Sequence, residues 1–122
     1  MNEKQAAIVI ELTHEFMATM RQIAPKYTKA FFRFSAEAGK HGSNGSYAID
    51  ANVALIDPFA HNKFFTSMNE KAMRLLSAME KKNGIILLAI DSAFNYDINF
   101  EYENFARWKI SKVNGGTGIP DL

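Results

Sequence analysis

The stretch IILLAIDSAFNYDINFEYENF, residues 85 to 105, decides the fold. Its first six residues, 85 to 90, are all apolar, which is typical of a central strand that is buried on both faces. From Tyr96 the chain alternates aromatic or aliphatic residues with polar or acidic ones, which predicts a strand with one face in a core and one in water. The residues from Ala93 to Asn95 are expected to form the turn between these two strands.

The segment before this stretch predicts a helix. Ser67 and Glu70 have the spacing of a capping box, and the apolar residues that follow continue to Met79. Asn83-Gly84 is the expected end of this helix. The irregular segment FAHNKFF, after Asp57-Pro58, is interpreted as the connection that leads into it.

Farther upstream, TKAFFRFSAEA (28–38) and the residues from Tyr47 to Leu55 both alternate and are expected to pair as a hairpin. The glycine-rich segment GKHGSNG (39–45) between them is the expected turn. The first strand has two distinct faces. One face holds Thr28, Ala30, Phe32, Phe34 and Ala36, and the other holds Lys29, Phe31, Arg33, Ser35 and Glu37.

The N-terminal residues predict an amphipathic helix that starts after a capping residue at Asn2 and runs to about Ile23, where Pro25 stops it. The predicted fold class is therefore α+β: a single antiparallel sheet of about four strands packed against two helices, in the order α-β-β-α-β-β. Residues 104–122 are open to interpretation as a further strand, a short helix or a frayed end. Within them, the glycine-rich residues 114–122 are expected to form a flexible tail.

Composition limits the classes of protein. A chain of 122 residues forms one domain, which buries roughly two-thirds of its unfolded surface. The absence of Cys excludes a disulfide framework and a thiolate zinc site. The apolar run AAIVI (6–10) is too short for a signal peptide or a membrane span, so a cytoplasmic protein is expected.

Signals for catalysis are weak. His14, His41 and His61 lack the close spacing of metal ligands, and no nucleophile is paired with a base in sequence. Acid-base cleavage of RNA by two histidines and a lysine is conceivable but has no supporting motif. The expected protein is therefore not an enzyme and has no cofactor and no metal.

Charge is unevenly distributed. The residues from Arg21 to Lys40 include five basic residues and one acid, whereas 83–106 contain four acids and no Lys or Arg. Such opposite patches can steer a charged partner, or they can pair with each other across neighbouring strands.

The basic segment KYTKAFFRF (26–34) supports an alternative function. Aromatic residues beside basic groups on a strand can stack nucleic-acid bases and hold phosphates, so a small single-stranded nucleic-acid-binding module is the alternative prediction. Only Phe31 shares a face with the charged residues, however, and core packing is the more common role of such rings.

Three segments together carry a resemblance to a known family: Gly45 to Asp50, the helix from Met73 to Met79, and YDINFEYENF (96–105) with Arg107, Trp108 and Lys109. In these segments the chain resembles the YezG-type immunity proteins of bacterial polymorphic toxin and contact-dependent inhibition systems. The resemblance extends to about Val113, so that 1–113 is a single immunity-like domain. It implies a small, cytoplasmic, noncatalytic protein that binds and neutralises a cognate toxin C-terminal domain, often a nuclease, by covering its active site or substrate surface.

A set of candidate toxin-binding residues follows from this resemblance and from the acidic strand. Carboxylates in a row can compete with a polyanion for a basic cleft, and interface energy concentrates in aromatic residues. The electrostatic contacts are expected to be Asp97, Glu101 and Glu103, and the aromatic anchor Tyr96 or Tyr102. Trp108 is expected to be either another anchor or part of the core. A homodimer is one way to cover the second face of the 85–90 strand; the two helices and the C-terminal segment are the other.

Overall fold

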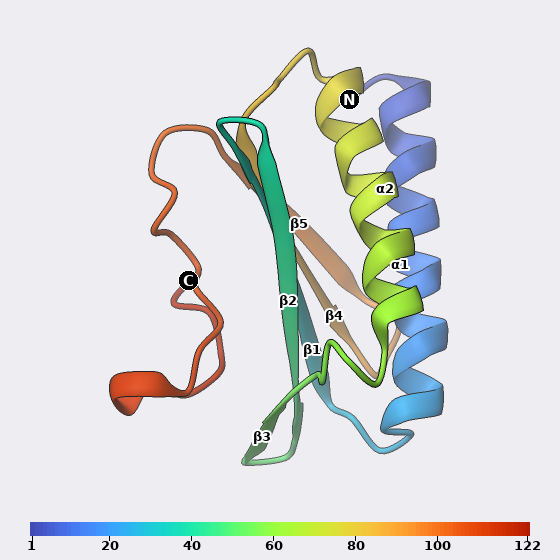
Figure 1. The fold of residues 1–122 in the computed structure, drawn as a ribbon. Helices are drawn as coiled ribbons and strands as arrows, with labels where there is room; N and C mark the ends of the chain where they lie inside the picture. The colour runs from blue at the N-terminus through green and yellow to red at the C-terminus, as the bar shows by residue number, and fades with distance from the viewer.

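Two helices cover one face of a five-stranded antiparallel sheet, and the C-terminal segment, residues 104–122, lies on the other face (Figure 1). The computed structural model describes all residues from 1 to 122. The elements in chain order are α1 (Glu3–Ile23), β1 (Lys29–Glu37), β2 (Lys40–Ile49), β3 (Asn52–Leu55), α2 (Asn62–Ala78), β4 (Gly84–Asp91), β5 (Tyr96–Glu101) and the short 3-10 helix η1 (Val113–Gly115). The strand order is β3-β2-β1-β4-β5, which confirms the predicted α+β class. Neither helix is both long and apolar enough to cross a membrane.

The number of strands differs from the prediction because the second expected strand is two strands. The chain turns at Asp50 and Ala51, where Asp50 has a φ of 54°, a left-handed conformation that Asp tolerates. Ile49 pairs with Asn52 across this turn. The alternating pattern of residue types continues through the turn, but the apolar residues after the turn lie on the opposite face of the sheet from those before it. Tyr47 and Ile49 pack on the helix side, whereas Val53 lies beside Gly118 of the C-terminal segment.

The turn between β1 and β2 was also predicted too late in the sequence. It lies at Ala38 and Gly39, which both have positive φ, and the residues from Lys40 to Gly45 belong to β2. Gly45 is required for a different reason. A Cβ atom there would lie 3.0 Å from the Phe31 carbonyl oxygen and 3.0 Å from Ile56, so this glycine allows a close approach inside the sheet.

The capping signal in the sequence marks the start of α1 correctly but not the start of α2. Asn2 caps α1 in a capping box with Gln5, as predicted for the start, and the helix ends at Ile23 before Pro25. The predicted capping box at Ser67 and Glu70 is wrong, because α2 begins at Asn62 and Ser67 lies inside it. The Ser67 hydroxyl instead donates to the Glu15 carboxylate at 2.9 Å, joining α2 to α1.

The main core is aromatic and lies between the helices and the sheet. Phe32 of β1 is in ring contact with Phe16 of α1 and with Phe64 and Phe65 of α2, at centroid distances of 6.2, 6.2 and 6.3 Å. These rings join both helices to the centre of the sheet.

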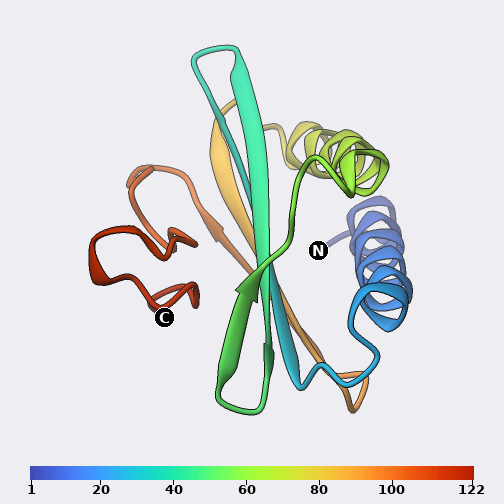
Figure 2. The ribbon, with the colours of Figure 1, turned by 60° about the horizontal axis from the view of Figure 1, so that its bottom comes forward.

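A second, smaller core lies on the opposite face. There, Ile85 and Leu87 of β4 and Phe31 of β1 pack against Trp108 and Ile110. The prediction that the 85–90 strand is buried on both faces is therefore confirmed. Its outer cover is the C-terminal segment of the same chain (Figure 2). Residues 114–122 return toward this face, with Gly118 and Pro120 buried, and their mobility stays a prediction.

Replacing Phe32 by Ala is expected to lower the free energy of unfolding by about 3–5 kcal/mol, because it opens a cavity among three other rings. Guanidinium-induced unfolding at pH 7 measures the change. The matched control is Phe59→Ala, whose side chain is 90% exposed and whose loss should cost less than about 0.5 kcal/mol. Equal losses from the two variants would contradict the central position of Phe32.

Candidate functional site

The basic strand predicted for nucleic-acid binding is covered by the C-terminal segment. The Arg33 guanidinium donates from Nε to the Arg107 carbonyl at 3.0 Å and from Nη2 to the Phe105 carbonyl at 2.9 Å. Burial lowers the pKa of Arg33 from its ordinary value. Phe31, the only ring on the charged face, is buried in the second core. The ring and the guanidinium that the alternative function requires are therefore both engaged inside the molecule.

Glu101, a predicted toxin contact, has an internal role. Its carboxylate lies 2.7 Å from the Arg107 guanidinium and accepts hydrogen bonds from the backbone N–H groups of Glu103 and Asn104. The ion-paired hydrogen bond with Arg107, followed by these two backbone bonds, lowers the pKa of Glu101 to about 2. Glu101 thus holds the bend that directs the chain from β5 onto the outer face.

Tyr102 and Trp108 are also engaged within the protein. The Tyr102 ring stacks on Phe100 at 6.4 Å and lies under the Lys81 ammonium at 4.5 Å, and burial raises the pKa of its hydroxyl. Trp108 is buried in the second core with the Arg107 guanidinium over its ring. Of the two roles expected for Trp108, the structure places it in the core.

The three remaining predicted residues are exposed. Tyr96 is 51% exposed, and the side chains of Asp97 and Glu103 reach solvent. The Asp97 carboxylate has one hydrogen-bond partner, the Asn99 side chain at 3.2 Å, and no cationic partner. The predicted row of three free carboxylates is therefore reduced to two.

The turn between β4 and β5 adds Phe94 to the candidate site, a residue that the sequence analysis did not identify. The Asp91 carboxylate accepts hydrogen bonds from the backbone N–H groups of Ala93 and Asn95, both at 2.9 Å, and from the Asn95 side chain. These bonds lower the pKa of Asp91, and those from Asn95 contribute most to the shift. The fixed turn projects Phe94, which is 60% exposed and has a φ of 66°. An aromatic residue inside a turn was the signal for it.

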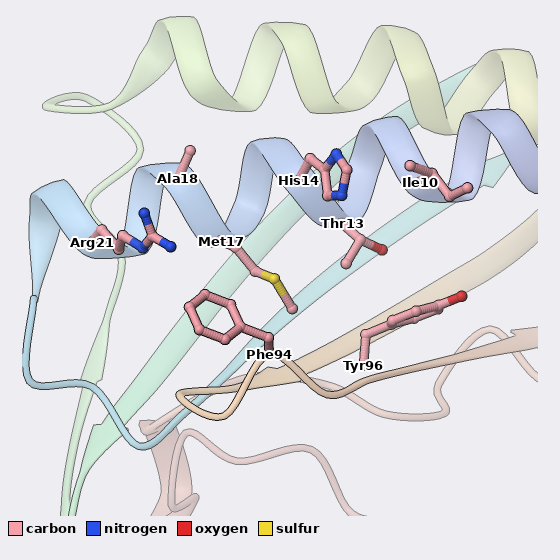
Figure 3. Close-up of a pocket in the computed structure, with 8 residues that line it drawn as sticks. All are labelled: Ile10, Thr13, His14, Met17, Ala18, Arg21, Phe94 and Tyr96. Atoms are coloured by element: carbon pink, nitrogen blue, oxygen red, sulfur yellow. The ribbon is translucent and has the colours of Figure 1, made fainter.

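Phe94 and Tyr96 form one wall of a groove of about 420 Å³, and α1 forms the other (Figure 3). The α1 wall consists of Ile10, Thr13, His14, Met17, Ala18 and Arg21. The Arg21 guanidinium lies over the Phe94 ring at 5.1 Å, and Ile10 is 48% exposed. Thr13 is buried, and its hydroxyl has no hydrogen-bond partner. We call this site the α1–β5 groove.

The chemistry of the groove suits apolar side chains. Its lining is mostly apolar and aromatic, with cationic Arg21 at one end, and no carboxylate lines it. Exposed aromatic residues in such a position are the usual anchors of a protein interface. The three histidines do not come together, and no group of three or more potential metal ligands occurs in the chain.

Glu101 predicts a specific pH dependence of stability. Its pKa is about 2 in the folded protein, below the ordinary value of 4.5, so its contribution to stability is fully present above pH 4.5 and is lost as the pH falls toward 2. Glu101→Gln removes this titration. The difference in unfolding midpoint between the wild type and Glu101→Gln is expected to shrink from pH 6 to pH 2.5, as measured by urea unfolding. A difference that stays constant would contradict the ion pair with Arg107.

No protein-family model matches the chain, and no curated protein matches it in sequence. The resemblance to YezG-type immunity proteins stays a prediction.

Proposed function

We propose that this protein is a cytoplasmic, noncatalytic immunity protein that neutralises a cognate antibacterial toxin domain by binding it through the β4–β5 hairpin and the α1–β5 groove. The observation that carries the proposal is the combination of two exposed aromatic rings and one carboxylate without a cationic partner on one hairpin: Phe94 and Tyr96 beside Asp97.

The aromatic residues supply anchors for tight binding. Large rings that are exposed in the free protein and enter a partner's pockets account for much of the energy of many interfaces. The Asp91 hydrogen bonds fix the turn that carries Phe94, and the pairing of β5 with β4 fixes the backbone at Tyr96. Little conformational entropy is therefore lost when this hairpin binds.

The carboxylates favour a basic partner. Asp97 and Glu103 lie in a segment without Lys or Arg, from residue 83 to residue 106, and neither has a cationic partner. A nuclease presents a basic cleft to its polyanionic substrate. Acids held on a strand and on the bend that follows it can occupy such a cleft and increase the rate of association. This supports a nuclease as the toxin.

The proposal is tested by coexpression with the C-terminal toxin domain encoded immediately upstream of its gene. Survival of the host cells and copurification of the two proteins are expected. A catalytically active toxin that kills the cells despite expression of this protein, with no complex, would reject the proposed function. Binding of single-stranded RNA or DNA that weakens steeply with salt would instead support the nucleic-acid-binding alternative.

The double variant Asp97→Lys/Glu103→Lys is expected to slow association with the toxin domain and to weaken binding by about tenfold or more, because it reverses the charge that attracts a basic partner. Surface plasmon resonance at low and high salt measures both quantities. The matched control is Glu70→Lys, at an exposed position of α2, which should change neither. Unchanged association in the double variant would show that another surface binds the toxin.

A further inference from the structure

The two edges of the sheet are protected differently. At the β3 edge, the Lys112 ammonium donates to the Val53 carbonyl at 2.9 Å, and Gly118 packs so closely that a Cβ atom would lie 3.0 Å from Val53. The β5 edge has no such cover. No hydrogen bond from elsewhere in the chain reaches the backbone of Tyr96, Ile98 or Phe100. Because unpaired edges can recruit another strand, this difference identifies β5 as the open edge.

The register shows which groups this open edge presents. The Asp91 N–H donates to the Asn95 carbonyl at 3.0 Å, and in an antiparallel ladder such bonded pairs alternate along the strands. Asp97, Asn99 and Glu101 therefore bond to β4. Tyr96, Ile98 and Phe100 direct their N–H and C=O groups outward, ready to pair with a sixth strand.

The α1–β5 groove lies beside this edge. Tyr96 lines the groove, and Ile98 and Phe100 face the helix side of the sheet together with it. In an added strand, the side chains opposite these three residues would also point to the helix side. They would enter the space bordered by Ile10 and Met17, which suits apolar groups, and a hydroxyl or amide among them could bond to the unpaired Thr13 hydroxyl.

The other face of an added strand would meet one unpaired carboxylate, that of Asp97. Residues opposite Asp97 and Asn99 would point to the outer face, at the closer, non-hydrogen-bonded spacing of about 4.5 Å between Cα atoms. Asp97 has no cationic partner in the chain, so a Lys or Arg opposite it would form a new cross-strand ion pair. The edge therefore favours a segment that has apolar residues on one face and a basic residue opposite Asp97 on the other.

A second copy of this chain fits less well. Two β5 strands paired about Ile98 would bring the two Asp97 carboxylates onto one face with no cation between them. Like charges on neighbouring strands weaken pairing. Charge complementarity thus selects a basic partner over self-association.

We propose that the open edge of β5 binds an extended segment of a partner protein by strand addition, with alternate apolar side chains in the α1–β5 groove and a basic side chain facing Asp97. The inference rests on the proposed function only for the identity of the partner as a toxin domain. It deepens that function by stating how the partner is held.

The first test uses a capped seven-residue peptide that alternates Lys and Val, starting and ending with Lys. NMR titration is expected to shift the amide signals of Tyr96, Ile98 and Phe100 and to slow their exchange with solvent. Methylation of the Val nitrogens, which face β5 in this register, should weaken binding by about tenfold or more, whereas methylation of the Lys nitrogens should not. A peptide with Glu in place of Lys should also bind more weakly. If millimolar Lys-Val peptide leaves the β5 signals unchanged, the proposal is overturned.

The second test uses the whole protein and the upstream toxin domain, with Ile98→Pro compared with Ile98→Ala. The Ile98 N–H faces outward, so proline removes a group used in strand addition but none used to pair with β4. Ile98→Pro is expected to weaken the complex by at least about tenfold more than Ile98→Ala does. Thermal unfolding confirms that both variants are folded. If Ile98→Pro unfolds, hydrogen exchange on the wild-type complex replaces this test. Slower exchange of the Ile98 and Phe100 amides with solvent in the complex is then the expected result.

The outcomes separate this inference from the proposed function. A toxin complex that tolerates Ile98→Pro and leaves the β5 amides unprotected rejects strand addition while the immunity function stands. Binding of the Lys-Val peptide without any toxin complex rejects the immunity function while the open edge stands. Light scattering is expected to show a monomer; a dimer abolished by Ile98→Pro would assign the edge to a second copy and overturn the proposal.

Discussion

Burial of β4 on both faces is the constraint on which the rest of the structure depends. The strand is apolar at every position from Ile85 to Ile90, so it needs a layer on each side. The helices supply one layer with the aromatic core around Phe32. The second layer comes from a segment with almost no regular structure, and Arg33 holds that segment by donating to two of its backbone carbonyls. A basic residue in the middle of the sheet thus serves as an attachment point for the chain's own C-terminal segment.

This second layer determines which surfaces remain for function. It covers the basic strand, takes Trp108 into a core and engages Glu101 in its first bend. What it leaves open is the other side of the hairpin, where Phe94 and Tyr96 face α1, and the outer edge of β5. The candidate site therefore combines the part of the acidic strand that the C-terminal segment does not use with the preceding turn and the facing side of α1.

Local patterns predicted the fold class, α1, the buried strand and the acidic strand, because each of these has a periodicity that reports its environment directly. They failed where a contact made far away in sequence decided the outcome. Gly45 resembles a turn residue, yet it admits the Phe31 carbonyl; Ser67 resembles a cap, yet it bonds to Glu15. In the site, the exposure of Asp97 and Tyr96 could be predicted from alternation. The engagement of Tyr102 with Met79 and Lys81 again depends on residues distant in sequence, whereas Glu101 pairs with Arg107 only six residues ahead, a contact that strand alternation does not report.

The position of Trp108 has a spectroscopic consequence. It is the only tryptophan in the chain, and it belongs to the C-terminal segment itself, in the small core on the sheet face opposite the helices. Its emission therefore reports whether that segment is docked, and it is largely blind to the core on the helix side, which contains phenylalanines and tyrosines but no tryptophan. Selective excitation of tryptophan thus provides an intrinsic optical probe for detachment of one layer, separable from the far-ultraviolet dichroism that follows the two helices.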